Sequence, residues 1–91
     1  MPLGRTVPSY RQALEAEIAR WEAFRRALRG KEVDAFDRMM EICRTHASAG
    51  SAAARPVISE SMFMCILLKQ EIELMEMRET LEHIKRLLQK P

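Results

Sequence analysis

The sequence predicts an all-α protein in which a helical hairpin precedes one long C-terminal helix and several chains assemble into an oligomeric helical bundle. Three observations predict this architecture. Apolar residues recur at three- and four-residue steps, which is the spacing of one face of an α-helix. Residues 57–90 contain neither Gly nor Pro. A chain of 91 residues forms one small domain, here expected at residues 9–91, and its core is thin.

The first helix is expected at residues 10–29, after a flexible N-terminal segment at residues 1–8. Ser9 is a candidate N-cap, because Gln12 stands three residues later and completes a capping-box pattern. Gly30 ends the helix, since glycine readily adopts the left-handed conformation found at helix ends. The apolar face of this helix comprises Leu14, Ile18, Trp21, Phe24 and Leu28.

The second helix is expected at residues 32–47. Gly30 and Lys31 are its only separation from the first helix, so the two should form an antiparallel or steeply bent hairpin. Residues 47–55 are nearly all small and are expected to form a loop. Pro56 then suits the first position of a helix, where its missing N–H costs nothing. The apolar face of the second helix comprises Val33, Phe36, Met39, Met40, Cys43 and Ala47.

The third helix is expected at residues 56–90, and its length is the central inference. At 1.5 Å per residue it spans about 52 Å, whereas the first two helices span about 30 Å and about 24 Å. Two helices that lie alongside the same segment cannot cover it. Cys43 and Cys65 are too few for a disulfide scaffold, so we expect a partner chain to cover the remainder.

The apolar pattern of the third helix also indicates a partner. Its first half is apolar nearly all round, which predicts burial on every side. Its second half narrows to a stripe with alternating steps of three and four residues, as in a two-heptad coiled coil. We expect Met39, Met62 and Met75 in the core, and Met64 and Met77 at an interface. The predicted interface comprises Phe63, Leu67, Leu74, Met77, Leu81, Ile84 and Leu88.

Charge is distributed unevenly along the chain. Residues 1–31 contain seven Lys and Arg against three Glu, and residues 32–91 contain eight against ten Asp and Glu. The basic cluster at the end of the first helix could contact phosphates, or simply stabilise the helix C-terminus. Stacking aromatic residues are missing, because Trp21 and Phe24 are needed in the core, so any binding would be weak and sequence-independent. This cluster comprises Arg25, Arg26, Arg29 and Lys31.

No pattern predicts catalysis, a metal or a cofactor. Cys43 and His46 are spaced like half of a zinc site, but Cys65 and His83 are about 27 Å apart along the third helix. Glutamates recur at three-residue steps from residue 73 to residue 82, so they spread around the helix instead of converging as in di-iron bundles. We therefore expect no enzyme. A metal- or nucleotide-dependent helical-bundle enzyme is the third hypothesis for function.

The location expected from the sequence is cytoplasmic. The N-terminal residues lack the continuous apolar region of a signal peptide. The longest apolar run, Met62 to Leu68, is far shorter than the roughly 20 residues of a membrane span.

The segment from Val7 to Trp21, which begins Val-Pro-Ser-Tyr-Arg, is followed later by Arg55-Pro56-Val57-Ile58. In these residues the chain resembles short uncharacterised helical proteins of archaea. The resemblance covers most of the chain and implies no known activity, so it assigns no functional residue.

The sequence thus predicts a non-catalytic oligomeric helical scaffold or accessory subunit that acts through helix–helix protein interaction. The expected partner is the protein itself, as a dimer or tetramer, or another helical protein. The alternative is a weak, sequence-independent nucleic-acid-binding accessory protein that uses the basic end of the first helix.

Overall fold

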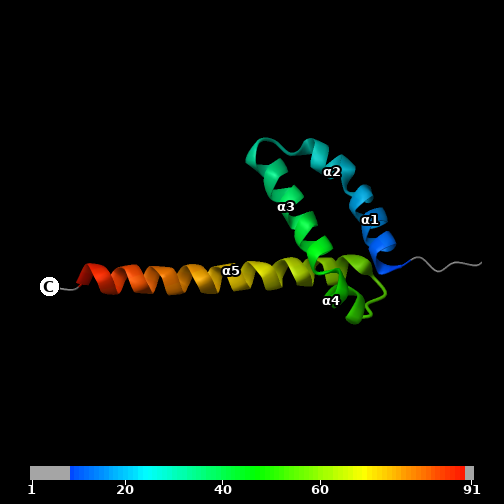
Figure 1. Cartoon of the computed structure of the whole chain (residues 1–91). Helices are drawn as coiled ribbons and strands as arrows, with labels where there is room; N and C mark the ends of the chain where they lie inside the picture. The colour runs from blue at the N-terminus through cyan, green and yellow to red at the C-terminus, as the bar shows by residue number, and fades with distance from the viewer. Residues whose placement is uncertain (1–8, 90–91) are drawn as a thin grey trace, which may run out of the picture.

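The fold is a helical hairpin placed on the first part of one long helix (Figure 1). The computed structural model describes residues 9–89, so the segment expected at residues 1–8 lies outside the described part. No strand occurs within residues 9–89, and the predicted all-α class is confirmed. The elements are α1 (Tyr10–Arg20), α2 (Glu22–Ala27), α3 (Lys31–Thr45), α4 (Ala47–Ala52) and α5 (Ile58–Gln89).

The predicted capping box at the start of α1 is confirmed. The Gln12 backbone N–H donates to Ser9 Oγ over 3.1 Å, and the Ser9 N–H donates to Gln12 Oε1 over 2.9 Å. These bonds satisfy two backbone donors at the helix start. Leu14, one turn further on, is almost completely buried in the core.

The first helix is not continuous over residues 10–29 as predicted, because it breaks at Trp21. The Trp21 backbone has φ −92° and ψ 8°, outside the helical region. The break lets the indole pack edge-on against Phe24, at 5.6 Å between ring centroids, and against Phe63 of α5, at 6.4 Å. Aromatic packing with a distant helix therefore overrides the local helical pattern.

The expected helix end at residue 29 is also wrong, because α2 ends at Ala27. Leu28 is extended, with ψ 158°, and Gly30 has φ +56°, a conformation that glycine adopts at little cost. Gly30 is the N-cap of α3, and the Glu32 carboxylate accepts a hydrogen bond from the Arg29 N–H over 3.0 Å. The backbone conformation of Gly30 and the hydrogen bond from Arg29 to Glu32 together stabilise the turn into α3.

Two bidentate ion pairs join the arms of the hairpin. Arg44 of α3 donates to both carboxylate oxygens of Glu15 in α1, over 2.7 and 3.0 Å. Arg25 of α2 donates to both oxygens of Asp37 in α3, over 2.7 and 2.8 Å. These hydrogen bonds lower the pKa of Glu15 and of Asp37. The core between the arms and α5 comprises Leu14, Phe36, Met40, Ile42, Cys43, Met62 and Ile66.

The segment expected to be a loop at residues 47–55 contains α4, and the second helix ends at Thr45 instead of residue 47. His46, with φ −99° and ψ 23°, separates α3 from α4. The small residues permit close packing: a Cβ on Gly50 would lie 2.4 Å from the hydroxyl oxygen of Tyr10. That hydroxyl bonds to Ser61 of α5 over 2.8 Å, so Tyr10 connects α1, α4 and α5.

The long helix begins at Ile58 instead of the predicted Pro56. Ala54 has φ +53°, so the chain is still turning at this point, and the helix starts only after Val57. Over 32 residues α5 is about 48 Å long. Beyond Glu73, which is ion-paired with Arg38 of α3, it projects away from the hairpin (Figure 1). Within residues 9–89, every helix is too short or too polar to cross a membrane.

Candidate interaction surface on the long helix

The hairpin covers only one side of the first half of α5. Met62, Cys65 and Ile66 are buried against it, as the apolar pattern predicted. The expectation of burial on every side is wrong for the single chain, because a hairpin one layer thick reaches one face of a helix. The apolar residues of this half that stay exposed are Phe63, Met64, Leu67, Leu68 and Ile72.

All seven predicted interface residues are exposed, by between 44% and 80% of their surface. Including Gln70 between Leu67 and Leu74 makes the steps alternate between four and three residues from Phe63 to Leu88. The predicted two heptads therefore extend along nearly the whole helix. Gln70 was missed because it is polar, although the spacing of its neighbours points to it. We call this set the seam: Phe63, Leu67, Gln70, Leu74, Met77, Leu81, Ile84 and Leu88.

The seam has the heptad pattern of a coiled coil. Leucine occupies every a position, at residues 67, 74, 81 and 88, and the d positions hold Phe63, Gln70, Met77 and Ile84. A seven-residue repeat drifts by about 20° per heptad on a straight helix. A facing helix can follow the seam by supercoiling with α5, each seam side chain inserting between four residues of that helix.

Charged residues flank the seam differently on its two sides. Glu71 and Arg78 stand on one flank and form an ion pair of 3.5 Å within the chain, both well exposed. Glu73 stands on the other flank, where Arg38 of α3 already binds it. Its side chain is 29% exposed. The first flank therefore has charges available to a facing helix, whereas the second has its acidic group occupied.

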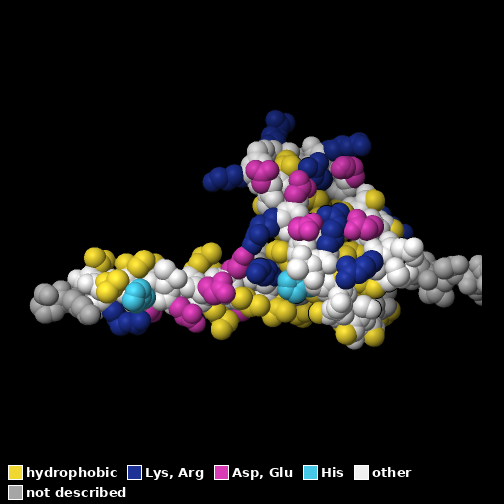
Figure 2. Space-filling model, viewed as in Figure 1, with side chains coloured by type: hydrophobic (Ala, Val, Ile, Leu, Met, Phe, Trp, Pro, Cys, Tyr) yellow, Lys and Arg dark blue, Asp and Glu magenta, His cyan; other side chains and the backbone are white. Residues whose placement is uncertain are grey.

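A second apolar stripe lies beside the seam, from the first half of α5 to just past its middle. It comprises Met64, Leu68, Ile72 and Met75, all of them exposed. The expectation that Met75 belongs to the core is wrong, because the hairpin ends before this turn of α5. Met62 is in the core as predicted, and Met39 packs against it. Figure 2 shows exposed hydrophobic side chains along α5 from the hairpin to its far end.

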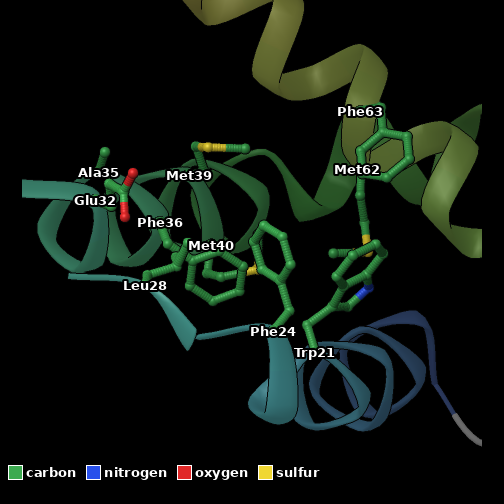
Figure 3. Close-up of a pocket in the computed structure, with 10 residues that line it drawn as sticks. All are labelled: Trp21, Phe24, Leu28, Glu32, Ala35, Phe36, Met39, Met40, Met62 and Phe63. Atoms are coloured by element: carbon green, nitrogen blue, oxygen red, sulfur yellow. The ribbon is translucent and has the colours of Figure 1, made fainter. Parts of the chain in front are cut away.

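An apolar cleft of about 320 Å³ opens between α2, α3 and α5 (Figure 3). Trp21 and Phe24 stand on one side of it, facing Met62 and Phe63 of α5. Phe24 was expected in the core but is half-exposed, because it lines this open cleft. Phe63 belongs to both the cleft and the seam, so the two surfaces are continuous.

The basic cluster is only partly available for a ligand. Arg25 is held by Asp37, and this hydrogen bond raises the pKa of the guanidinium. Arg26, Arg29 and Lys31 are exposed near the turn between α2 and α3, where basic side chains project in Figure 2. No ion pair within residues 9–89 involves these three residues.

The family model for a domain of unknown function, DUF8156, matches residues 3–91. The chain belongs to this family. Its match includes the hairpin and the whole of α5, so the long helix is part of the DUF8156 domain. Among the curated proteins none matches the chain significantly, and the same is true of the solved structures.

In this DUF8156 chain both cysteines are buried and free. The Cys43 thiol lies 3.6 Å from the Met62 carbonyl oxygen, and the Cys65 thiol lies 3.8 Å from that of His46. Burial raises the pKa of Cys43 to about 11 and also raises that of Cys65, so both stay protonated at neutral pH. Within the described residues, no three His, Cys, Asp or Glu side chains gather where they could hold a metal ion.

Proposed function

We propose that this protein is a non-catalytic oligomeric scaffold or accessory subunit that acts through helix–helix contacts of α5. The observation that carries the proposal is the seam, a line of exposed side chains at coiled-coil spacing, all apolar except Gln70, on a helix that projects away from its own hairpin. Continuous exposed apolar surface of this kind is typical of protein interaction sites.

The projecting part of α5 also needs a partner for its stability. Residues 74–89 contact no other helix closely enough to be buried. Isolated helices of about 12–15 residues are marginal in water, and helices in proteins are stabilised mainly by packing of an apolar face. A facing helix on the seam would supply that packing.

The area of the seam suits a stable interface. Each apolar seam residue exposes on the order of 100 Å². Covering seven of them on two chains would remove roughly 1,400 Å² from water, and stable interfaces bury about 1,200–2,000 Å². The rest of the second stripe, Leu68, Ile72 and Met75, points away from the seam, so it would stay exposed in such a dimer and could join two dimers into a tetramer.

Nucleic-acid binding is the second candidate. It is supported by Arg26, Arg29 and Lys31, which are exposed close together at one end of the hairpin. Glu32 and Asp34 lie next to them and weaken the positive potential. We therefore rank this function below helix–helix association, and expect any such binding to be non-specific and sensitive to salt.

The test of the first proposal is Leu81→Asp, compared with the wild type by sedimentation velocity. Leu81 is 59% exposed in the single chain, so the substitution should leave α1–α4 folded. It places a charge in the middle of the seam, and we expect the assembly to dissociate. His83→Asp is the control, because it introduces an acidic side chain on the opposite side of α5. A Leu81→Asp protein that keeps the wild-type oligomeric mass would contradict the proposal.

A further inference from the structure

We infer that the helix facing α5 is α5 of a second copy, running antiparallel, and that the C-terminal end of each α5 covers the apolar cleft of the other chain. The inference rests on the proposed function, and it names the partner and the direction of the helix. It is carried by the length of the seam, by the charges on its flanks and by the position of the cleft.

Antiparallel pairing covers the seam completely. The projecting second half of each α5 then lies against the first half of the other chain's α5. It covers the face of that first half which the hairpin leaves exposed. In the fully overlapped register, Phe63 faces the partner's Leu88 and Leu67 faces the partner's Ile84. Toward the centre, Leu74 faces the partner's Met77. Gln70 faces the partner's Leu81, so the polar seam residue does not meet its own copy.

The flanking charges and the coverage of the seam together select this register. With full overlap, Glu71 lies beside the partner's Arg78, and the symmetry of the dimer makes this attractive contact twice. A shift of one heptad in one direction brings Glu71 beside the partner's Glu71 and uncovers Ile84 and Leu88. A shift in the other direction brings Arg78 beside the partner's Arg78 and uncovers Phe63 and Leu67. The first shift therefore places like charges together and exposes part of the seam. The second also brings Glu71 beside the partner's Lys85, so it is disfavoured mainly because Phe63 and Leu67 lose their cover.

A parallel pair of α5 helices would form weaker ion pairs between the two chains. In that arrangement Arg78 would have to bind the partner's Glu73, across the other flank of the seam. Glu73 is already ion-paired with Arg38 of its own α3 and is only 29% exposed. Glu71, in contrast, is 56% exposed and is paired only with Arg78 of its own helix.

The cleft lies where the antiparallel register places the end of the partner helix. Leu88 is the most exposed large apolar residue of the described chain, at 80%, and it would meet Phe63 at the cleft. Leu87 stands on the flank of the seam, level with the partner's Ile66, whose position around α5 lies between those of Met62 and Phe63. Since its own hairpin buries Ile66, Leu87 would meet the cleft beside it. Leucine side chains would thus enter the apolar space bounded by Trp21 and Phe24 (Figure 3).

Cysteine cross-linking tests the direction. We would prepare Leu67→Cys and Ile84→Cys separately in the full chain, then oxidise each alone and the two mixed after exchange of subunits. In the antiparallel pair, residue 67 lies about 26 Å along the axis from its own copy, too far for a disulfide. We expect cross-linked dimer only in the mixture. The wild type is the control, because Cys43 and Cys65 are buried.

The outcomes separate this inference from the proposed function. Cross-linking of each variant alone would show a parallel pair and overturn the antiparallel direction while leaving the oligomeric function intact. An oligomeric wild-type mass with no cross-link in any sample would overturn the register. A monomeric wild-type mass would overturn the proposed function itself, together with the inference.

Tryptophan fluorescence tests the occupancy of the cleft. Trp21 is the only tryptophan and lines the cleft. We expect its emission to shift to longer wavelength when the assembly dissociates on dilution, and to be shifted equally in Leu81→Asp at all concentrations. An emission maximum that is the same in assembled and dissociated protein would overturn the placement of the partner's leucines in the cleft.

Discussion

Replacing Gln70 with leucine makes every member of the seam apolar. Gln70 is exposed in the single chain, so the substitution leaves the packing of the hairpin on α5 unchanged. Its effect should therefore fall on association. Glutamine and leucine also have similar helix propensities, which keeps the stability of α5 itself nearly constant.

The magnitude follows from the exposure of the neighbouring seam residues. Leu67 and Leu74 keep 58% and 44% of their surface exposed, so association buries about half of a leucine at such a position. Full burial of a leucine stabilises by about 2 kcal/mol, so each new leucine adds about 1 kcal/mol and a dimer gains about 2 kcal/mol. The dissociation constant should fall roughly 30-fold.

Sedimentation equilibrium over a dilution series measures this change. Gln89→Leu is the matched control, because residue 89 lies outside the seam on the same helix and should change the constant little. A Gln70→Leu protein with the wild-type dissociation constant, or with weaker association, would refute the placement of residue 70 between two helices.

Three further predictions concern the part of the chain before α5. Gly50→Ala should lower the free energy of unfolding by about 1–3 kcal/mol in denaturant titrations, because the added Cβ displaces Tyr10 and its hydrogen bond. Since folding raises the pKa of Cys43 from 9.0 to about 11, the folded state keeps a proton that the unfolded state loses in this range. Stability should fall as pH rises from about 9 to 11, more steeply than in Cys43→Ala by up to about 1.4 kcal/mol per pH unit. Binding to single-stranded nucleic acid should be weak, fall with salt and decrease in Arg26→Gln/Arg29→Gln; affinity independent of salt would exclude phosphate contacts.

Much of the fold follows from local signals in the sequence. The Ser9 capping box, the helical spacing and the uninterrupted C-terminal stretch depend on residues close together in the chain, and each is found in the structure. The greater length of α5 compared with the hairpin helices follows directly from the rise per residue of an α-helix. For the same reason, seven of the eight exposed seam residues could be named from their spacing.

The features that were not predicted depend on contacts between distant residues. At the break the Trp21 indole packs against Phe63 of α5, and in α4 Gly50 lies against the Tyr10 side chain. The cleft forms where three helices meet, so no single stretch of sequence indicates it.

The central claim is that α5 is covered by another copy of the chain. Light scattering coupled to size-exclusion chromatography, over a wide range of loading concentrations, tests it directly. We predict the mass of a dimer or a tetramer that stays constant above the dissociation constant. A monomeric mass at every concentration would contradict the claim.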